Sequence, residues 1–244
     1  MERGQDRDRE VRSSDELLAM VAHDLRNPLN TIVLSAELLL ASLASDEGEQ
    51  LSRPLRRIRS GADRLGVMLA QLVDLARIRL DGAIAIEPGP VDLRRVVEEA
   101  IDAVLEPLRG ATAAPPIELD VRGDCAGDWD PERLGQVAST LIGNAVAHGE
   151  PAAPIAVVVD GSRRDEVVLE VRNAGAIPVD VLPRLFDPYR RLAAPAPGAP
   201  RARGLGLGLC VALHIVTAHG GRLDVRSSDN ATAVTVALPR WQAR

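Results

Sequence analysis

The segment that decides the fold of the N-terminal third is residues 51–76, LSRPLRRIRSGADRLGVMLAQLVDLA. Apolar side chains recur in it at alternating steps of four and three residues, namely Leu51, Leu55, Ile58, Ala62, Leu65, Leu69, Leu72 and Ala76. This spacing aligns them along one stripe of an α-helix and is typical of helices that pack lengthwise against other helices. We therefore predict a long helix with a continuous apolar seam.

A second helix is predicted on the N-terminal side of this segment. Ser13 and Glu16 have the spacing of a capping box, in which each side chain bonds to a free backbone N–H at a helix start. The apolar residues that follow form a second stripe, which includes Leu18, Val21, Leu25, Ile32 and Leu39. Pro28 lies inside this stripe, where it removes one backbone donor and should bend the helix without ending it.

The two helices are predicted to form an antiparallel hairpin, because residues 45–48, Ser-Asp-Glu-Gly, have the composition of a turn. One hairpin cannot cover its own broad apolar face, so we expect a dimeric four-helix bundle formed by two copies of the chain. Residues 1–12 are mostly charged and are expected to be a solvated extension. They are too few for a folded input domain, so the signal is expected from a separate sensor protein or from sequence upstream.

The composition excludes several classes of function. With 35 acidic and 29 basic residues the formal charge is -6, which does not favour binding to nucleic acid or to an anionic membrane. Aromatic residues make up only 2% of the chain, so stacking on single-stranded nucleic acid is excluded and an aliphatic core is predicted. Cys125 and Cys210 are too isolated to suggest a disulfide framework or a zinc site. This cysteine usage fits a reducing cytoplasm, and because no apolar run reaches the ~18–20 residues that span a bilayer, we expect no direct membrane insertion.

A second domain is predicted after residues 81–90, a connector that contains glycine and proline. Its helices are predicted at 93–108, 131–148 and 206–218, and its strands at 117–121, 155–160, 167–173, 222–227 and 232–238. This mixture of helices and hairpin-like strands indicates an α+β sandwich, with helices on one face of a mixed or antiparallel sheet.

Residues 22–29, AHDLRNPL, place His23 on the first helix, with Asp24 beside it and Asn27 four residues later on nearly the same face. The string resembles the phosphoacceptor box of sensor histidine kinases. The resemblance implies that His23 accepts a phosphoryl group and that Asp24 holds the proton of the other ring nitrogen. It also implies that Asn27 orients a water for dephosphorylating the partner, the receiver domain of a response regulator. A neutral imidazole nitrogen is a suitable nucleophile for a γ-phosphoryl group.

Residues 131–145, PERLGQVASTLIGNA, contain Asn144 within a helix that is otherwise largely apolar, where its amide needs a partner. The stretch is similar to the N box of the GHKL ATPases. The resemblance implies that Asn144 coordinates the Mg²⁺ that bridges the nucleotide phosphates, a role that an amide oxygen can fill. The family usually has a second asparagine and a basic residue where this chain has Thr140 and Ala147.

Residues 171–178, VRNAGAIP, lie at the end of a predicted strand and resemble the G1 box of the same family. The resemblance implies that residue 173 accepts a hydrogen bond from the adenine amino group of ATP and that Gly175 lets the backbone approach the base. The family usually has an aspartate where this chain has Asn173. An amide is a weaker acceptor than a carboxylate, since charge-assisted hydrogen bonds are roughly twice as strong as neutral ones.

Residues 204–209, GLGLGL, directly precede a predicted amphipathic helix. Repeated glycines at a helix start let backbone N–H groups approach an anion. The string matches the G2 box of histidine kinases, which implies that Gly204, Gly206 and Gly208 lie at the nucleotide phosphates.

The segment between the G1 and G2 strings also resembles this family. Residues 185–191, LFDPYRR, are similar to the F box, and the Pro/Ala stretch at 193–200 would then be the ATP lid. The resemblance places Arg190 and Arg203 among the basic residues that meet the phosphates.

The order and spacing of these strings identify the chain as a member of the sensor histidine kinases. The resemblance implies an all-α phosphoacceptor hairpin at 13–82, a linker at 83–90 and an ATP-binding α+β sandwich of the GHKL (Bergerat) type at 91–244. The implied function is Mg²⁺- and ATP-dependent autophosphorylation of His23, transfer to an aspartate of a response regulator, and phosphatase activity toward that partner.

Two alternatives stay open from the sequence. Thr140, Ala147 and Asn173 would also suit an ATP-independent phosphotransfer or phosphatase scaffold with a degenerate nucleotide site. A GHKL ATPase outside two-component signalling, such as a serine kinase, is the other alternative, and the hairpin that carries His23 argues against it.

Overall fold

The computed structural model describes Leu25 and residues 29–39, 52–108, 115–150, 153–188, 205–228 and 230–241. The chain divides into two compact units, Met1–Val73 and Asp74–Arg244. The sequence predicts that the phosphoacceptor hairpin ends at residue 82 and that the ATP-binding domain begins at residue 91. These domain limits stay a prediction, because the division into compact units does not by itself define functional domains.

The first unit is helical wherever the structure describes it. Residues 29–39 form one helix, and the helix predicted from residues 51–76 is confirmed as α2 (Ser52–Asp81), which continues into the second unit. Large apolar side chains on these helices are between 44% and 61% exposed: Leu29, Val33, Leu34, Leu38, Leu55, Val67, Leu69 and Val73. The capping box at Ser13, the bend at Pro28 and the turn at 45–48 lie outside the described residues.

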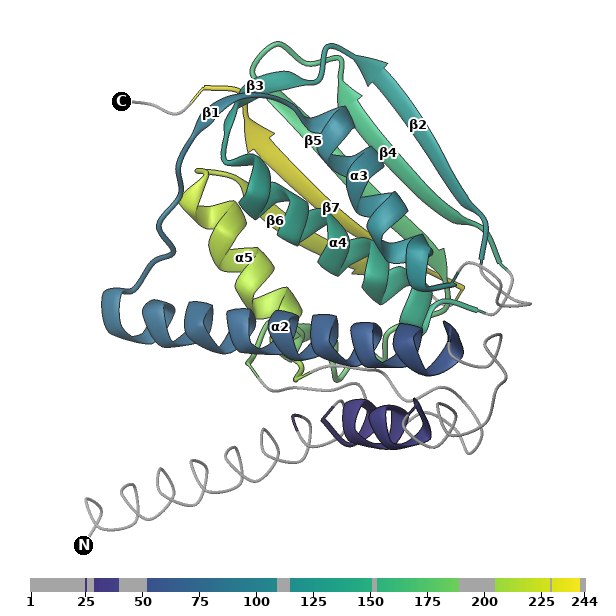
Figure 1. Cartoon of the computed structure of the whole chain (residues 1–244). Helices are drawn as coiled ribbons and strands as arrows, with labels where there is room; N and C mark the ends of the chain where they lie inside the picture. Colours follow the sequence, from purple (N-terminus) through teal and green to yellow (C-terminus); the bar gives the residue numbers. More distant parts are fainter. Residues whose placement is uncertain are drawn as a thin grey trace, which may run out of the picture. The chain divides into compact units, whose positions relative to one another are not determined.

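The second unit is a sheet with helices packed on one face (Figure 1). The strand order is β2 (Ile117–Gly123), β4 (Ile155–Gly161), β5 (Glu166–Ala174), β7 (Ala231–Pro239) and β6 (Arg222–Ser227). The covering helices are α3 (Leu93–Leu105), α4 (Pro131–His148) and α5 (Gly208–Ala218). The pair β2–β4 is parallel and the other pairs are antiparallel, so the predicted α+β sandwich with a mixed sheet is confirmed.

Several short elements were not predicted from the sequence. Strand β1 (Gly89–Asp92) begins at the end of the predicted connector and pairs with β3 (Ala126–Trp129) as a separate antiparallel sheet. The 3-10 helix η3 (Leu182–Arg184) was not predicted either, whereas the 3-10 helix η2 (Glu106–Leu108) lies within the helix predicted at 93–108. Strands of four residues with glycine, proline and aspartate carry too little periodicity to be recognised.

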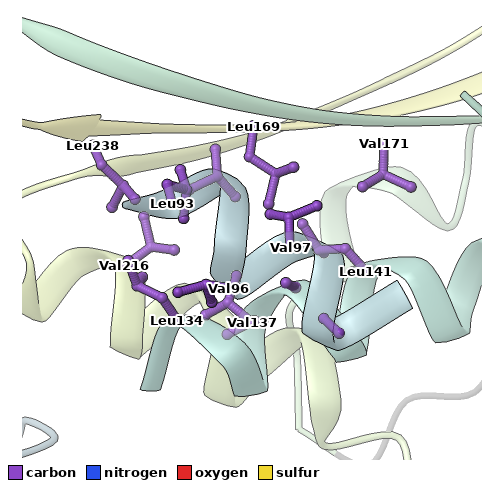
Figure 2. Packing of buried hydrophobic residues seen from close by; sticks show 14 of the residues in the cluster. Leu93, Val96, Val97, Leu134, Val137, Leu141, Leu169, Val171, Val216 and Leu238 are labelled. Atoms are coloured by element: carbon purple, nitrogen blue, oxygen red, sulfur yellow. The ribbon is translucent and has the colours of Figure 1, made fainter. Parts of the chain in front are cut away.

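The core lies between the sheet and the helices and is aliphatic, as predicted. Alternate residues of the central strands are buried, among them Val157 on β4 and Leu169 on β5. Figure 2 shows Leu169 and Val171 of the sheet facing Val97 and Leu141 of the helices. Among the described residues, one aromatic side chain, that of Trp129, is fully buried in this core, and its Nε1–H donates to the Pro239 carbonyl at 2.8 Å.

Asp130 fixes the start of α4. Its Oδ1 accepts from the backbone N–H of Arg133 at 3.0 Å and its Oδ2 from that of Glu87 at 2.9 Å, while Pro131 occupies the first turn. Burial acts to raise the pKa of the Asp130 carboxyl, but these two hydrogen bonds, together with smaller contributions from His219 and the backbone N–H of Glu132, lower that pKa. The backbone N–H of Asp130 donates to Nε2 of His219 at 3.0 Å.

His219 is completely buried in its neutral form. Nδ1 lies 2.8 Å from the Ile215 carbonyl and donates its proton there, so Nε2 is left to accept from Asp130. Burial lowers the pKa of His219. The unfolded chain takes up this proton near pH ~6.5, whereas the folded chain resists it until a lower pH.

Stability should therefore fall on acidification through His219. Its contribution is complete above pH ~6.5 and is lost as the pH drops toward the folded pKa. Urea unfolding at a series of pH values should show a steeper loss of unfolding free energy between about pH 7 and about pH 5 in the wild type than in His219→Gln. Equal slopes in the two proteins would contradict this assignment.

Arg240 is a buried cation at the end of β7, 6% exposed. Its guanidinium donates to the carbonyls of Asp124, Ala126, Gly161 and Arg163, at distances of 2.5 to 3.2 Å. These carbonyls lie in the β2–β3 and β4–β5 connections or at the strand ends that border them. One side chain thus ties both loops to the end of the last strand.

Replacing Arg240 by Met should destabilise the second unit by roughly 2–4 kcal/mol, because several buried carbonyls lose their donor. Arg240→Lys should recover part of this loss, since an ammonium has fewer donors than the guanidinium. Denaturant unfolding measures both variants, with the exposed Arg172→Met as control. A loss in Arg240→Met no larger than in the control would show that the carbonyls are satisfied without it.

Candidate nucleotide site

Helix α4 carries Asn144 in its last two turns. Leu141, Ile142 and Ala145 around it are buried in the core, which leaves Asn144 half-buried at the border of the helix layer. Its amide forms no side-chain hydrogen bond within the part of the chain that the structure describes. An amide oxygen that is half-buried and without a protein partner is suited to a cation or a polar ligand.

Asn173 is the penultimate residue of β5 and lies beside the C-terminal end of α4. Nδ2 of Asn173 donates to the Ala174 carbonyl at 2.8 Å, so the amide oxygen Oδ1 is the atom left to accept from a ligand. Gly149, the residue that ends α4, is close enough that a Cβ on it would lie 3.4 Å from the Asn173 Cβ. The backbone N–H of Glu150 also donates to the Ala174 carbonyl, at 3.1 Å.

Gly175 continues this turn with a φ of +111°, a conformation that side-chain-bearing residues rarely adopt. A Cβ at this position would lie 3.4 Å from the His148 carbonyl at the end of α4. The Gly175 N–H donates to the Asn230 carbonyl at 3.1 Å. The backbone conformation therefore brings the turn close to the end of α4 and gives a reason for glycine here.

Two hydroxyl groups that sequence reasoning missed support the Gly175 turn. Thr232 of β7 is 6% exposed and donates from Oγ1 to the Gly175 carbonyl at 2.8 Å. Ser227 of β6 lies 3.2 Å from that Oγ1 and accepts from the backbone N–H of Ile177 at 2.8 Å. A polar residue among buried strand positions was the available signal for Thr232, and nothing local marks Ser227.

The residues around the C-terminal end of α4 form the first part of the candidate site, and the start of α5 forms the second. Gly206 has a φ of +68° and Gly208 is the first residue of the helix, while Leu205 and Leu207 on either side of Gly206 are fully buried. Leu207 at the cap position provides no side-chain acceptor for the first N–H groups of α5. Such N–H groups, together with the helix dipole, favour an anion.

The structure therefore brings together Asn144, Asn173 and Gly175 around the C-terminal end of α4. Gly206 and Gly208 lie at the start of α5, which packs against α4. The predicted residues His23, Asp24, Asn27, Arg190, Arg203 and Gly204 lie outside the described residues, as does the predicted lid at 193–200.

The described residues hold no group of three or more His, Cys, Asp or Glu side chains that could bind a metal ion by themselves. The amide oxygen of Asn144 can still serve as one ligand of a Mg²⁺ ion. This ion commonly takes few protein ligands and completes its shell with water and the phosphates of a nucleotide. The described cysteines, Cys125 and Cys210, are buried free thiols.

Two regions of the chain match known protein families. Residues 13–80 match the His Kinase A (phospho-acceptor) domain, and residues 129–242 match the family described as histidine kinase-, DNA gyrase B-, and HSP90-like ATPase. The two matches follow each other in the order that the sequence strings predict. The chain therefore belongs to the sensor histidine kinases, as their phosphoacceptor and ATPase regions.

Individual histidine kinases are also similar to this chain. The signal transduction histidine-protein kinase AfsQ2 of Streptomyces coelicolor is 32% identical over 240 residues, which cover 93% of this chain and 42% of AfsQ2. Full-length ShkA, solved in complex with AMPPNP, is 24% identical, with a TM-score of 0.61 over 94% of this chain and 47% of ShkA. ThkA, solved in complex with the response regulator protein TrrA, is 21% identical, with a TM-score of 0.59 over 98% of this chain and 66% of that chain.

The chain thus spans less than half the length of AfsQ2 and of ShkA. The likeness to the two solved structures establishes the fold. In the part of the chain that the structure describes, no helix combines the length and the apolar character needed to cross a membrane.

Asn173→Ala should weaken binding of ATP about tenfold, the effect of losing one net hydrogen bond of roughly 1–1.5 kcal/mol. Titration calorimetry with Mg-ATP measures the change. Arg172→Ala, at the exposed neighbouring position, is the control and should bind like the wild type. An unchanged affinity of Asn173→Ala would remove Asn173 from the nucleotide site.

Proposed function

We propose that the chain is the catalytic part of a two-component sensor kinase, which transfers the γ-phosphoryl group of ATP to His23 and then to an aspartate of a response regulator. The observation that carries the proposal is the order of the two matched regions, a phosphoacceptor region at 13–80 and an ATPase region at 129–242. The local geometry at Asn144, Asn173 and Gly175 supports it.

The proposed nucleotide contacts divide between the two ends of the site. Oδ1 of Asn173 would accept from the exocyclic amine of adenine, because Nδ2 is already engaged with Ala174. The Gly175 turn would lie against the base, and Gly206 and Gly208 would present backbone N–H groups to the phosphates. Asn144 would hold Mg²⁺ through its amide oxygen. When bound, this ion neutralises charge on the phosphate oxygens.

The proposed chemistry at His23 is an in-line displacement. The lone pair of one ring nitrogen attacks the γ-phosphorus, the bond from that phosphorus to the β–γ bridging oxygen breaks, and ADP leaves. Asp24 would hold the proton on the other ring nitrogen and stabilise the positive charge that develops on the ring. Asn27 would orient a water when the partner is dephosphorylated.

A homodimer is part of the proposal. The exposed apolar side chains of the first unit, such as Leu34 and Leu69, lie on helices whose sequence pattern predicts lengthwise packing. A second copy of the hairpin would cover them. We also place the chain in the cytoplasm, where free thiols such as Cys125 and Cys210 stay reduced.

The receiver domain of a response regulator is the proposed protein partner, and a separate sensor protein or a further segment of the same protein is the proposed source of the signal. ThkA was solved in complex with a response regulator, which supports this choice of partner.

Incubation with Mg²⁺ and γ-labelled ATP should label the protein, and the label should be lost in acid and kept in base, as a phosphohistidine requires. His23→Ala should abolish labelling while dimerisation and nucleotide binding are retained. The control is His214→Gln on α5, which should label like the wild type.

Label that persists in His23→Ala would overturn the assignment of the acceptor. A folded, dimeric wild type that takes up no label and binds no Mg-ATP would instead support the phosphotransfer or phosphatase scaffold.

A further inference from the structure

The C-terminal part of α2 carries a buried carboxylate that the nucleotide site does not use. The Asp74 side chain is only 4% exposed. Nη1 of Arg133 lies 3.0 Å from its Oδ1 and 3.1 Å from its Oδ2, and Nε2 of Gln136 donates to Oδ2 at 3.0 Å. Nη1 of Arg133 also donates to Oε1 of Gln136 at 3.0 Å. We call these three side chains the Asp74 cluster.

The Asp74 cluster lies entirely within the second unit, which begins at Asp74. It joins the end of α2 to the first turns of α4, where Arg133 and Gln136 stand three residues apart on one face. An apolar contact between two helices can slide, but a carboxylate held by two donors fixes one register. Arg133 is 20% exposed at its side chain, so water screens this ion pair only weakly.

Apolar packing holds the same stretch of chain. Leu75 beside Asp74 is 5% exposed, and Ile78 packs against the core of the second unit. Beyond α2, Ile84 is 3% exposed. The end of α2 is therefore seated on the second unit by both polar and apolar contacts.

The predicted connector at 83–90 is fixed as well. The backbone N–H of Glu87 donates to Asp130, and β1 pairs with β3 from Gly89 to Asp92. A segment that is pinned at Ile84, Glu87 and β1 has little freedom to act as a hinge. Any pivot between the phosphoacceptor helices and the nucleotide-binding unit then has to lie elsewhere.

We propose that the Asp74 cluster is the joint that makes the last turns of α2 a fixed part of the nucleotide-binding unit, so that the pivot lies inside α2, on the N-terminal side of Asp74. The cluster residues are positioning residues. They act through α4, which also carries Asn144, so the orientation of the nucleotide site follows the end of α2. The mechanical part of this inference is independent of the proposed kinase function, and its kinetic consequence rests on that function.

Hydrogen exchange on the full-length chain tests the joint. Asp74→Asn removes the charge and keeps the shape, and it should speed exchange of the amides of residues 75–82 at least tenfold while β4 and β5 stay unchanged. Asp81→Asn makes the same chemical change at an exposed position of the same helix and should leave exchange unaltered. Gln136→Ala keeps the ion pair and should give an intermediate increase, which also provides the measurement if Asp74→Asn does not fold. If the amides of residues 75–82 exchange at the wild-type rate in both Asp74→Asn and Gln136→Ala, the proposal is wrong.

The kinetic constants of autophosphorylation distinguish a positioning role of the Asp74 cluster from a general loss of structure. A loosened joint lowers the effective concentration of bound ATP at the acceptor histidine, so Asp74→Asn should reduce kcat of autophosphorylation at least fivefold with KM for ATP within twofold. A parallel loss in both constants, or no loss in either, would overturn the positioning role. If the wild type does not autophosphorylate, the proposed function fails, whereas the exchange result still decides the joint.

Two glycines offer a matched test of where the pivot lies. A Cβ on Gly66 of α2 or on Gly89 of β1 would meet nothing within 4 Å, and neither residue has a positive φ. Gly66→Ala stiffens α2 and should lower kcat at least threefold at constant KM, while Gly89→Ala should leave both constants within twofold. The reverse pattern would put the pivot in the connector and overturn the proposal.

Discussion

The carboxylate of Asp130 is the constraint on which the second unit depends. It caps α4 and accepts from the backbone N–H of Glu87 in the connector, while the backbone N–H of Asp130 donates to buried His219 at the end of α5. Three segments far apart in the sequence thus converge on one residue. Asp130 fixes the point at which α4 begins. The positions of Asn144, near the C-terminal end of α4, and of the Asp74 cluster, near its N-terminal end, therefore depend on the same cap.

The fold was largely predictable because its elements are long and periodic. The 4-3 spacing of residues 51–76 gave α2, and apolar alternation gave β4, β5 and β7 with nearly correct limits. β1 and β3 were missed, since their pairing depends on partners more than 30 residues apart and not on local pattern. The burial of Arg240 was also beyond prediction, because its acceptors are backbone carbonyls at strand ends and in the adjoining loops, which no side-chain pattern marks.

The candidate site was predictable where a residue type carries its own chemistry. Gly175 and Gly206 stand where the backbone has a positive φ, and Asn173 stands at the end of a strand with one amide atom free. Thr232 and Ser227 escaped prediction because hydroxyl residues are ordinary in strands, and only the three-dimensional turn shows which carbonyl they reach. Asp74 and Arg133 likewise look like surface charges on amphipathic helices until α2 and α4 are seen to meet.

The two tryptophans of this chain sit in opposite environments, with Trp129 fully buried and Trp241 70% exposed. Because indole emission moves to shorter wavelengths in an apolar setting, the two rings should contribute separable bands to the intrinsic fluorescence. Trp129 is bonded to Pro239 at the end of β7 and stands next to Asp130, so its band would report on the closure of the second unit around its last strand. The first unit contains no tryptophan, so it is optically silent in such a measurement.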